Sequence, residues 1–173
     1  MWPSVLLMNF LKSPMKTTLF AVLASFLYGP ALAETYELSV TRKGSNTYKV
    51  SGKDIIIQTK YCYVYAYSED AILKSSGYGG DLIFIDSHDK CDVKAVFGPS
   101  DQRSGKYKVT VSRENDDWYE IFGLNTYIKT SMCLSLALGE EAVLSHKGGG
   151  VGTLIFNDGN SCMVEGLYSK LRL

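Results

Sequence analysis

Hydrophobic and polar residues alternate along many short stretches of this chain, which is the spacing of β-strands whose side chains point to opposite faces. The longest alternating stretch is IIIQTKYCYVYAY, from Ile55 to Tyr67, and it ends in four tyrosines at every second position. Shorter stretches are YELSV from Tyr36, TYKVSG from Thr47, and LIFID from Leu82 with a following CDVKAVF. Glycine-rich turns, SSGYGG and HKGGGVG, are typical of hairpins. The pattern predicts an all-β protein, and SEDAILK suits either a further strand or a short helix.

The alternating pattern repeats. The stretch from Tyr48 to Leu73 matches the stretch from Tyr119 to Leu144 at an offset of 71 residues. The residues that agree at this offset are Gly52 and Gly123, Ile57 and Ile128, Thr59 and Thr130, Cys62 and Cys133, Ala66 and Ala137, Glu69 and Glu140, Ala71 and Ala142, and Leu73 and Leu144. Arg42 with Arg113 and Cys91 with Cys162 extend the match in both directions. These identities predict an internal duplication.

The duplication divides the chain into two homologous β-units, residues 34–104 and residues 105–173. The polar, glycine-containing stretch GPSDQRSG, from Gly98 to Gly105, connects them. Each unit has an apolar strand face that needs a cover. We therefore expect two tandem, disulfide-closed β-units that pack through their apolar faces into one compact body.

Residues 1–33 have the three regions of a secretory signal peptide. An apolar run, TTLFAVLASFLY, follows Lys16, and Ala31-Leu32-Ala33 forms an A-x-A cleavage pattern. MKTTLF from Met15 resembles a natural start, so residues 1–14 are interpreted as an upstream extension. We expect an exported protein, periplasmic or extracellular, that starts at Glu34 and has no stable membrane insertion after cleavage.

The four cysteines are expected to form disulfides, because an exported chain enters an oxidising compartment. Cys62 and Cys91 are 29 residues apart, as are Cys133 and Cys162. Of the three possible pairings, duplication favours the two within units, because a single ancestral unit had only its own two cysteines to join. Beside the cysteines only two histidines are present, and no CxxC or HxxxH spacing occurs, so no metal site is predicted.

Composition and motifs narrow the function further. The formal net charge is zero, which gives no indication of nucleic-acid binding. The sequence has no G-x-S-x-G, H-E-x-x-H or Walker motif, so no cofactor and no catalytic residue are assigned. Glu69 and Glu140 recur at matching places. They are interpreted either as ion-pair partners of Arg42 and Arg113 or as a general acid–base pair.

The tyrosine stretch has two interpretations. At its counterpart positions the second unit has Met132, Leu134, Leu136 and Leu138, and an aliphatic face is normally buried. The tyrosines are therefore expected to belong to the core, with hydroxyls at its rim. Yet this stretch is also where the units differ most in chemistry. The binding hypothesis assigns the partner site to Tyr63, Tyr65 and Tyr67, with His88 in the longer SHDK loop of the first unit.

The sequence thus predicts a non-catalytic exported protein that binds another protein, including the inhibitor or immunity type. The first alternative is a carbohydrate or cell-wall binding module, in which the tyrosines and Trp118 stack on sugar rings. The second alternative is a hydrolase that uses Glu69 and Glu140.

Overall fold

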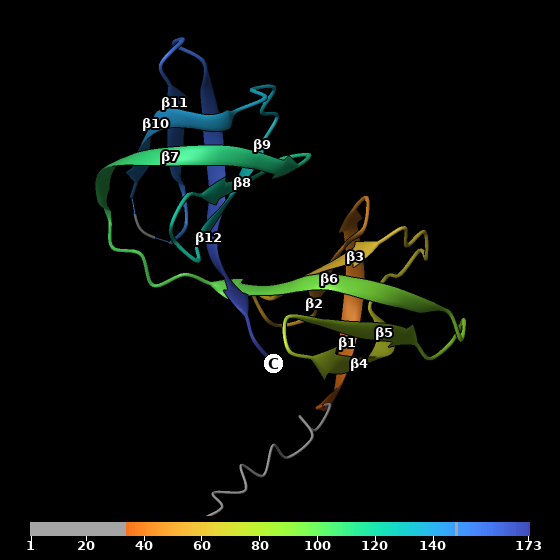
Figure 1. Ribbon diagram of the computed structural model, residues 1–173. Coiled ribbons are helices and arrows are strands. Elements are labelled where there is room, and N and C mark those ends of the chain that lie inside the picture. The colour runs from red at the N-terminus through yellow and green to blue at the C-terminus, as the bar shows by residue number, and fades with distance from the viewer. Residues whose placement is uncertain (1–33, 148) are drawn as a thin grey trace, which may run out of the picture. The chain divides into compact units, whose positions relative to one another are not determined.

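The computed structural model describes residues 34–147 and 149–173, and in these ranges it contains twelve strands and no helix (Figure 1). The strands are β1 Thr35–Gly44, β2 Thr47–Val50, β3 Ile56–Lys60, β4 Glu69–Ser76, β5 Gly79–Phe84, β6 Lys90–Pro99, β7 Gly105–Asn115, β8 Trp118–Ile121, β9 Tyr127–Ser131, β10 Leu138–His146, β11 Gly152–Phe156 and β12 Ser161–Leu171. The prediction of an all-β protein is confirmed, and the ambiguous SEDAILK segment belongs to strand β4. The predicted signal peptide, residues 1–33, lies outside the described residues.

The strands form two sets of six, which we call the first half (β1–β6) and the second half (β7–β12). The first half has the strand order β6-β3-β2-β1-β4-β5, and β5 pairs again with β6. The second half has the order β12-β9-β8-β7-β10-β11, and β11 pairs again with β12. Every strand in each set therefore has a hydrogen-bonded neighbour on both sides. The predicted division between residues 104 and 105 falls between β6 and β7.

The two halves pair through β6 and β12, whose register runs from Pro99 opposite Tyr168 to Val96 opposite Leu171. A separate hydrophobic cluster lies at this junction. It consists of Ile56, Ala95, Phe97, Trp118 and Tyr168, with the partly buried Tyr127 packed against it. The ring centroids of Phe97 and Trp118 are 5.0 Å apart, and those of Trp118 and Tyr168 are 5.3 Å apart.

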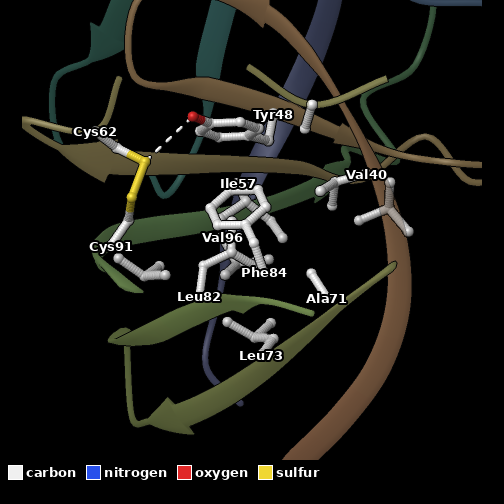
Figure 2. Packing of buried hydrophobic residues seen from close by; sticks show 13 residues of the cluster. Val40, Tyr48, Ile57, Cys62, Ala71, Leu73, Leu82, Phe84, Cys91 and Val96 are labelled. Carbon is white, nitrogen blue, oxygen red and sulfur yellow. Dashed lines mark hydrogen bonds between the residues drawn. A yellow bond between two sulfur atoms is a disulfide. The ribbon is translucent and has the colours of Figure 1, made fainter. Parts of the chain in front are cut away.

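Each half also has a core of its own, enclosed by its six strands. In the first half Tyr48 and Phe84 pack with ring centroids 5.3 Å apart, and both are fully buried among aliphatic side chains (Figure 2). In the second half Tyr119 and Phe156 pack in the same way at 5.7 Å. Burial of each large apolar side chain contributes about 1.5–3 kcal/mol, so these clusters account for much of the driving force for folding.

Two disulfides close the halves. Cys62 is joined to Cys91 and Cys133 to Cys162, with Cα–Cα distances of 5.5 Å and 5.2 Å. Each bond joins the segment after the third strand of its half to the sixth strand. The pairing within units that the sequence predicts is therefore confirmed.

One strand is shorter than the sequence predicts. The alternating pattern indicates a single long strand from Ile55 to Tyr67, but β3 ends at Lys60. Tyr61 has a positive φ of 50°, a left-handed conformation that interrupts strand pairing. The tyrosine segment consequently lies between β3 and β4 and is part of neither strand.

Candidate functional site: two exposed apolar rows

The segment after β3 and the segment after β9 each present a row of large side chains to solvent. We call Tyr61, Tyr63, Tyr65 and Tyr67 the tyrosine row, and Met132, Leu134, Leu136 and Leu138 the aliphatic row. The exposed fractions are 77–86% in the tyrosine row and 79–89% in the aliphatic row. The prediction that this face belongs to the core is therefore wrong for both halves.

The backbone explains why an apolar face points outward. Ile57 and Thr59 in β3 are buried, and strict alternation would bury Tyr61 as well. Instead Lys60 and Tyr61 are both exposed, because the left-handed turn at Tyr61 reverses the phase of the alternation. Met132 has a φ of 51° and does the same in the second half. Positive φ values also end the two segments, at Ser68 (52°) and Gly139 (69°).

Within each segment, the small residues that alternate with the exposed side chains face inward. Cys62 and Ala66 in the first segment are each 2% exposed, and Cys133 and Ala137 in the second have the same value. The disulfides therefore lie directly beneath the rows. Because the inward side chains are small, the backbone of each segment lies close to the core.

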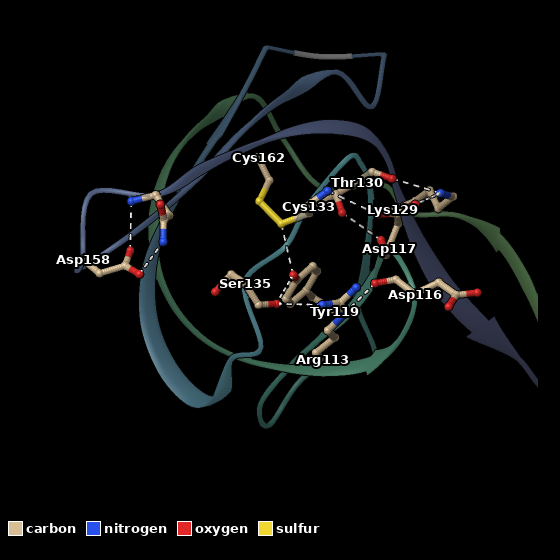
Figure 3. Close-up of a disulfide and its surroundings, with 11 residues drawn as sticks. Arg113, Asp116, Asp117, Tyr119, Lys129, Thr130, Cys133, Ser135, Asp158 and Cys162 are labelled. Atoms are coloured by element: carbon tan, nitrogen blue, oxygen red, sulfur yellow. Dashed lines mark hydrogen bonds and ion pairs between the residues drawn. A yellow bond between two sulfur atoms is a disulfide. The ribbon is translucent and has the colours of Figure 1, made fainter.

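Hydrogen bonds fix the middle of the tyrosine row. The Tyr48 hydroxyl, which extends from β2, donates to the carbonyl oxygen of Val64 at 2.7 Å and lies 3.1 Å from the sulfur of Cys62 (Figure 2). Burial raises the pKa of Tyr48, which keeps the hydroxyl protonated as a donor. In the second half Tyr119 donates to the carbonyl oxygen of Ser135 and also bonds to the sulfur of Cys133 at 3.0 Å (Figure 3).

The ends of the segments are bonded to the first strand and the first turn of each half. The Cys62 N–H donates to Asn46 Oδ1 at 2.7 Å, and the Ser68 N–H donates to Thr41 Oγ1 at 3.0 Å. The second half repeats both contacts, and the pairs there are Cys133 N–H with Asp117 Oδ1 and Gly139 N–H with Ser112 Oγ. Both rows are thus held on fixed backbones.

Arg42 and Arg113, which recur at matching places in the sequence, donate hydrogen bonds to the same two segments. The Arg42 backbone N–H donates to the carbonyl oxygen of Ala66 at 2.9 Å, and its guanidinium donates to the carbonyl oxygen of Tyr63 at 3.3 Å. Arg113 likewise donates its backbone N–H to the carbonyl oxygen of Ala137, but its guanidinium bonds to that of Ser135, the counterpart of Val64, at 3.3 Å. Within the described residues, neither arginine forms the ion pair with Glu69 or Glu140 that the sequence suggested.

The other predicted site residues belong to different elements from the tyrosine row. His88 lies in the turn between β5 and β6, where its Nδ1 is 3.3 Å from the carbonyl oxygen of Asp86. Glu69 begins β4 in the first half, whereas Glu140 lies in β10 of the second. Trp118 is only 3% exposed and packs in the junction cluster, so its ring is not accessible for stacking on a sugar.

Two features were missed at the level of sequence. Phe122 and Leu124, in the turn between β8 and β9, are 78% and 54% exposed. A charged cleft of about 420 Å³ lies beside Trp118. In it the Lys129 Nζ is 3.8 Å from Asp117 Oδ2 and 3.7 Å from Glu165 Oε2. No spacing rule reveals either feature, because both depend on turns and on contacts between the halves.

Within the described ranges, no group of three or more His, Cys, Asp or Glu side chains is arranged to hold a metal ion. The same ranges contain no helix that is long and apolar enough to cross a membrane. In comparisons with protein-family models, curated proteins and solved structures, none matches this chain.

Proposed function

We propose that this is an exported, non-catalytic protein that binds another protein through the tyrosine row of its first half. The observation that carries the proposal is the exposure of Tyr61, Tyr63, Tyr65 and Tyr67, each at 77% or more. A contiguous exposed apolar patch is typical of an interaction site. Tyrosine is enriched in such sites because it combines a rigid apolar ring with a polar tip.

The size and rigidity of the row support this function. A tyrosine buries about 150–250 Å² when covered, so four side chains exposed to this degree offer roughly 600 Å², close to the ~800 Å² per partner of a standard interface. The disulfide and the Tyr48 hydroxyl hold the backbone beneath them. A row that is already ordered loses little conformational entropy on binding.

Export is supported by two independent observations. Disulfides form in oxidising compartments, and this chain has one in each half. The predicted signal peptide, residues 1–33, points to the same route. A periplasmic or extracellular partner is therefore proposed, and a toxin or hydrolase as that partner would make this protein an inhibitor or immunity protein.

We further propose that the halves arose by duplication of one β-unit. The 71-residue offset of the sequence match is supported by the identical strand order of the halves. It is also supported by contacts that recur at that offset, including the hydroxyl bonds of Tyr48 and Tyr119. On this proposal, shared features serve the fold, and the site of function is sought where the halves differ.

Glycan binding is a second candidate, because exposed tyrosine rings can stack on sugar faces. Only the tyrosine row supports it, since Trp118 is buried. Binding of the purified protein to cell-wall material, abolished by alanine at Tyr63 and Tyr65, would favour this candidate over a protein partner.

The proposal is tested by giving the first half the side chains of the second. A photo-crosslinking residue at position 65 identifies the partner in the exported fraction, and the same residue at Tyr78, which is half exposed, serves as the control position. The affinity of the purified partner is then measured for the wild type and for the triple variant Tyr63→Leu, Tyr65→Leu and Tyr67→Leu. We expect a loss of more than ~2 kcal/mol in binding free energy, with unchanged stability. Unchanged affinity in the folded variant would overturn the proposal.

A further inference from the structure

The tyrosine segment uses mainly one edge of its main chain for internal hydrogen bonds. From Tyr61 to Tyr67, exposed tyrosines alternate with buried or half-buried residues, as in an extended chain. In such a chain, the peptide groups of alternate residues point to the same edge. Three bonds to the β1–β2 hairpin use the N–H of Cys62 and the carbonyl oxygens of Val64 and Ala66.

The opposite edge belongs to the tyrosines themselves. The carbonyl oxygen of Tyr63 accepts one long bond from the Arg42 guanidinium, at 3.3 Å. The N–H and C=O groups of Tyr65 and Tyr67 have no hydrogen-bond partner among the residues that the structure describes. Unpaired peptide groups therefore lie beside the exposed rings.

This edge is unusual within the fold. In both halves the strands close into a complete circuit, so each of the twelve strands is paired on both sides. The tyrosine segment and its counterpart in the second half thus provide main-chain edges that are not already occupied. An exposed edge of this kind is a template for the pairing of another chain.

Resting on the proposed function, we infer that the partner delivers an extended polypeptide segment, which pairs as a strand with the main chain of Tyr63–Tyr67. Main-chain hydrogen bonds supply affinity in this mode, and alternate side chains supply specificity. The chain from Tyr61 to Ser68 carries no charged residue, so we infer an uncharged partner segment with apolar side chains at alternate positions. Its paired stretch is about five residues long, or roughly 17 Å.

A comparison with the second half explains why we assign the strand-pairing site to the first half. Leu134 and Leu136 have an equivalent free edge, but Leu138 is already part of β10 and pairs with Ser112 of β7. In the first half β4 begins only at Glu69, so Tyr67 remains unpaired. The free edge therefore extends to Tyr67 in the first half, where the exposed side chains also have polar tips that can bond to a partner.

The test uses linear peptides, so it does not depend on the natural partner. A displayed library of random linear peptides is selected on the exported protein, with counter-selection on a Tyr63→Ala, Tyr65→Ala, Tyr67→Ala variant. Selected peptides are synthesised with N-methyl groups on either set of alternate residues, which blocks one main-chain edge and keeps the side chains. We expect one set to weaken binding at least ~10-fold and the other to leave it unchanged. We also expect amide exchange at Tyr65 and Tyr67 to slow in the complex.

Each other outcome overturns the inference. If both methylated sets bind like the parent peptide while binding still requires the tyrosines, the proposed function stands and the strand pairing is wrong. If no peptide is enriched, an extended segment is not the ligand, and the partner titration described above then decides the proposed function independently. Self-association that protects the Tyr65 amide would assign the edge to a second copy of the chain. Binding to neutral lipid vesicles instead of peptides would overturn both proposals.

Discussion

The tyrosine row and the aliphatic row have the same frame and different outward side chains. Both begin at a residue with positive φ and are followed by another, both lie over a disulfide, and both are held by a buried tyrosine hydroxyl. Their inward residues keep the same small size, whereas the outward ones are phenols in one half and aliphatic groups in the other. Packing constrains the inward positions and leaves the outward positions free to differ, and on the proposed function the outward positions serve recognition.

The junction between the halves gives a second contrast. At the 71-residue offset, Phe97 of the first half corresponds to Tyr168 of the second, and Ile56 corresponds to Tyr127. All four contribute to the junction cluster, with Trp118 at its centre. The halves therefore have equivalent cores, but they contribute different side chains to the surface that joins them.

The largest effect is expected at this junction. Trp118→Ala removes a ring that packs on Phe97 and Tyr168, and loss of a buried Trp costs about 3–5 kcal/mol of unfolding free energy. Because β6 and β12 are the only strands that pair the halves within the described residues, we expect unfolding to separate into two transitions in denaturant. Leu134→Ala, at an exposed position, is the matched control and should change stability by no more than ~0.5 kcal/mol. A loss below ~1 kcal/mol for Trp118→Ala would contradict this account of the junction.

The disulfides test whether the halves are equivalent in stability. The double variants Cys62→Ala with Cys91→Ala, and Cys133→Ala with Cys162→Ala, each open a loop of the same sequence separation, 29 residues. Loop entropy predicts a similar loss of about 3–4 kcal/mol in each case, measured by denaturant unfolding. If one pair costs much less than the other, the halves do not share a common frame.

The contrast between the rows also shows what the sequence could predict. Period-two alternation predicted the all-β class, and the cysteine spacing, interpreted through duplication, predicted both disulfides. The alternation left β4 undecided between strand and helix and made β3 too long. They were not sufficient for the orientation of the rows, because one left-handed residue, Tyr61 or Met132, reverses the phase without altering the spacing. Neither residue is a glycine, so no turn signal marked the reversal.

The candidate site could likewise be predicted only in part from the sequence. Tyr63, Tyr65 and Tyr67 were singled out by their difference from the second half, although hydrophobicity favoured burial. The sequence could not predict the role of Arg42, because its acceptors are backbone carbonyl oxygens that no side-chain pattern reveals. The burial of Trp118 depends on contacts with the other half, which alternation within one strand does not encode.

A smaller effect is expected from the hydroxyls beneath the rows. Tyr48→Phe leaves the carbonyl oxygen of Val64 without its donor, and Tyr119→Phe leaves that of Ser135 with only the longer bond from Arg113. Loss of a buried hydrogen bond costs about 1–2 kcal/mol, and we expect the two losses to agree within ~0.5 kcal/mol. Amide exchange should also speed up locally at the rows, with the strands of both cores unaffected. A change in exchange spread over a whole half would show that the hydroxyl stabilises the core rather than the row.

The smallest effect is expected in the unfolding free energy at alkaline pH, and it distinguishes the side chains that the two halves contribute to the junction. Burial, with added repulsion from Glu120, raises the pKa of Tyr127 to about 12, and burial with Asp54 nearby raises that of Tyr168 to about 12.

A tyrosine whose pKa is raised in the folded state contributes stability fully below its unfolded value near 10, and loses it as the pH rises toward 12. Unfolding free energy measured between pH 9 and pH 11.5 should therefore fall less steeply in a variant with both Tyr127→Phe and Tyr168→Phe. The first-half counterparts, Ile56 and Phe97, do not titrate, so the difference comes from the second-half side of the junction. Equal slopes in the wild type and the double variant would show that the junction tyrosines ionise as easily in the folded chain as in the unfolded one.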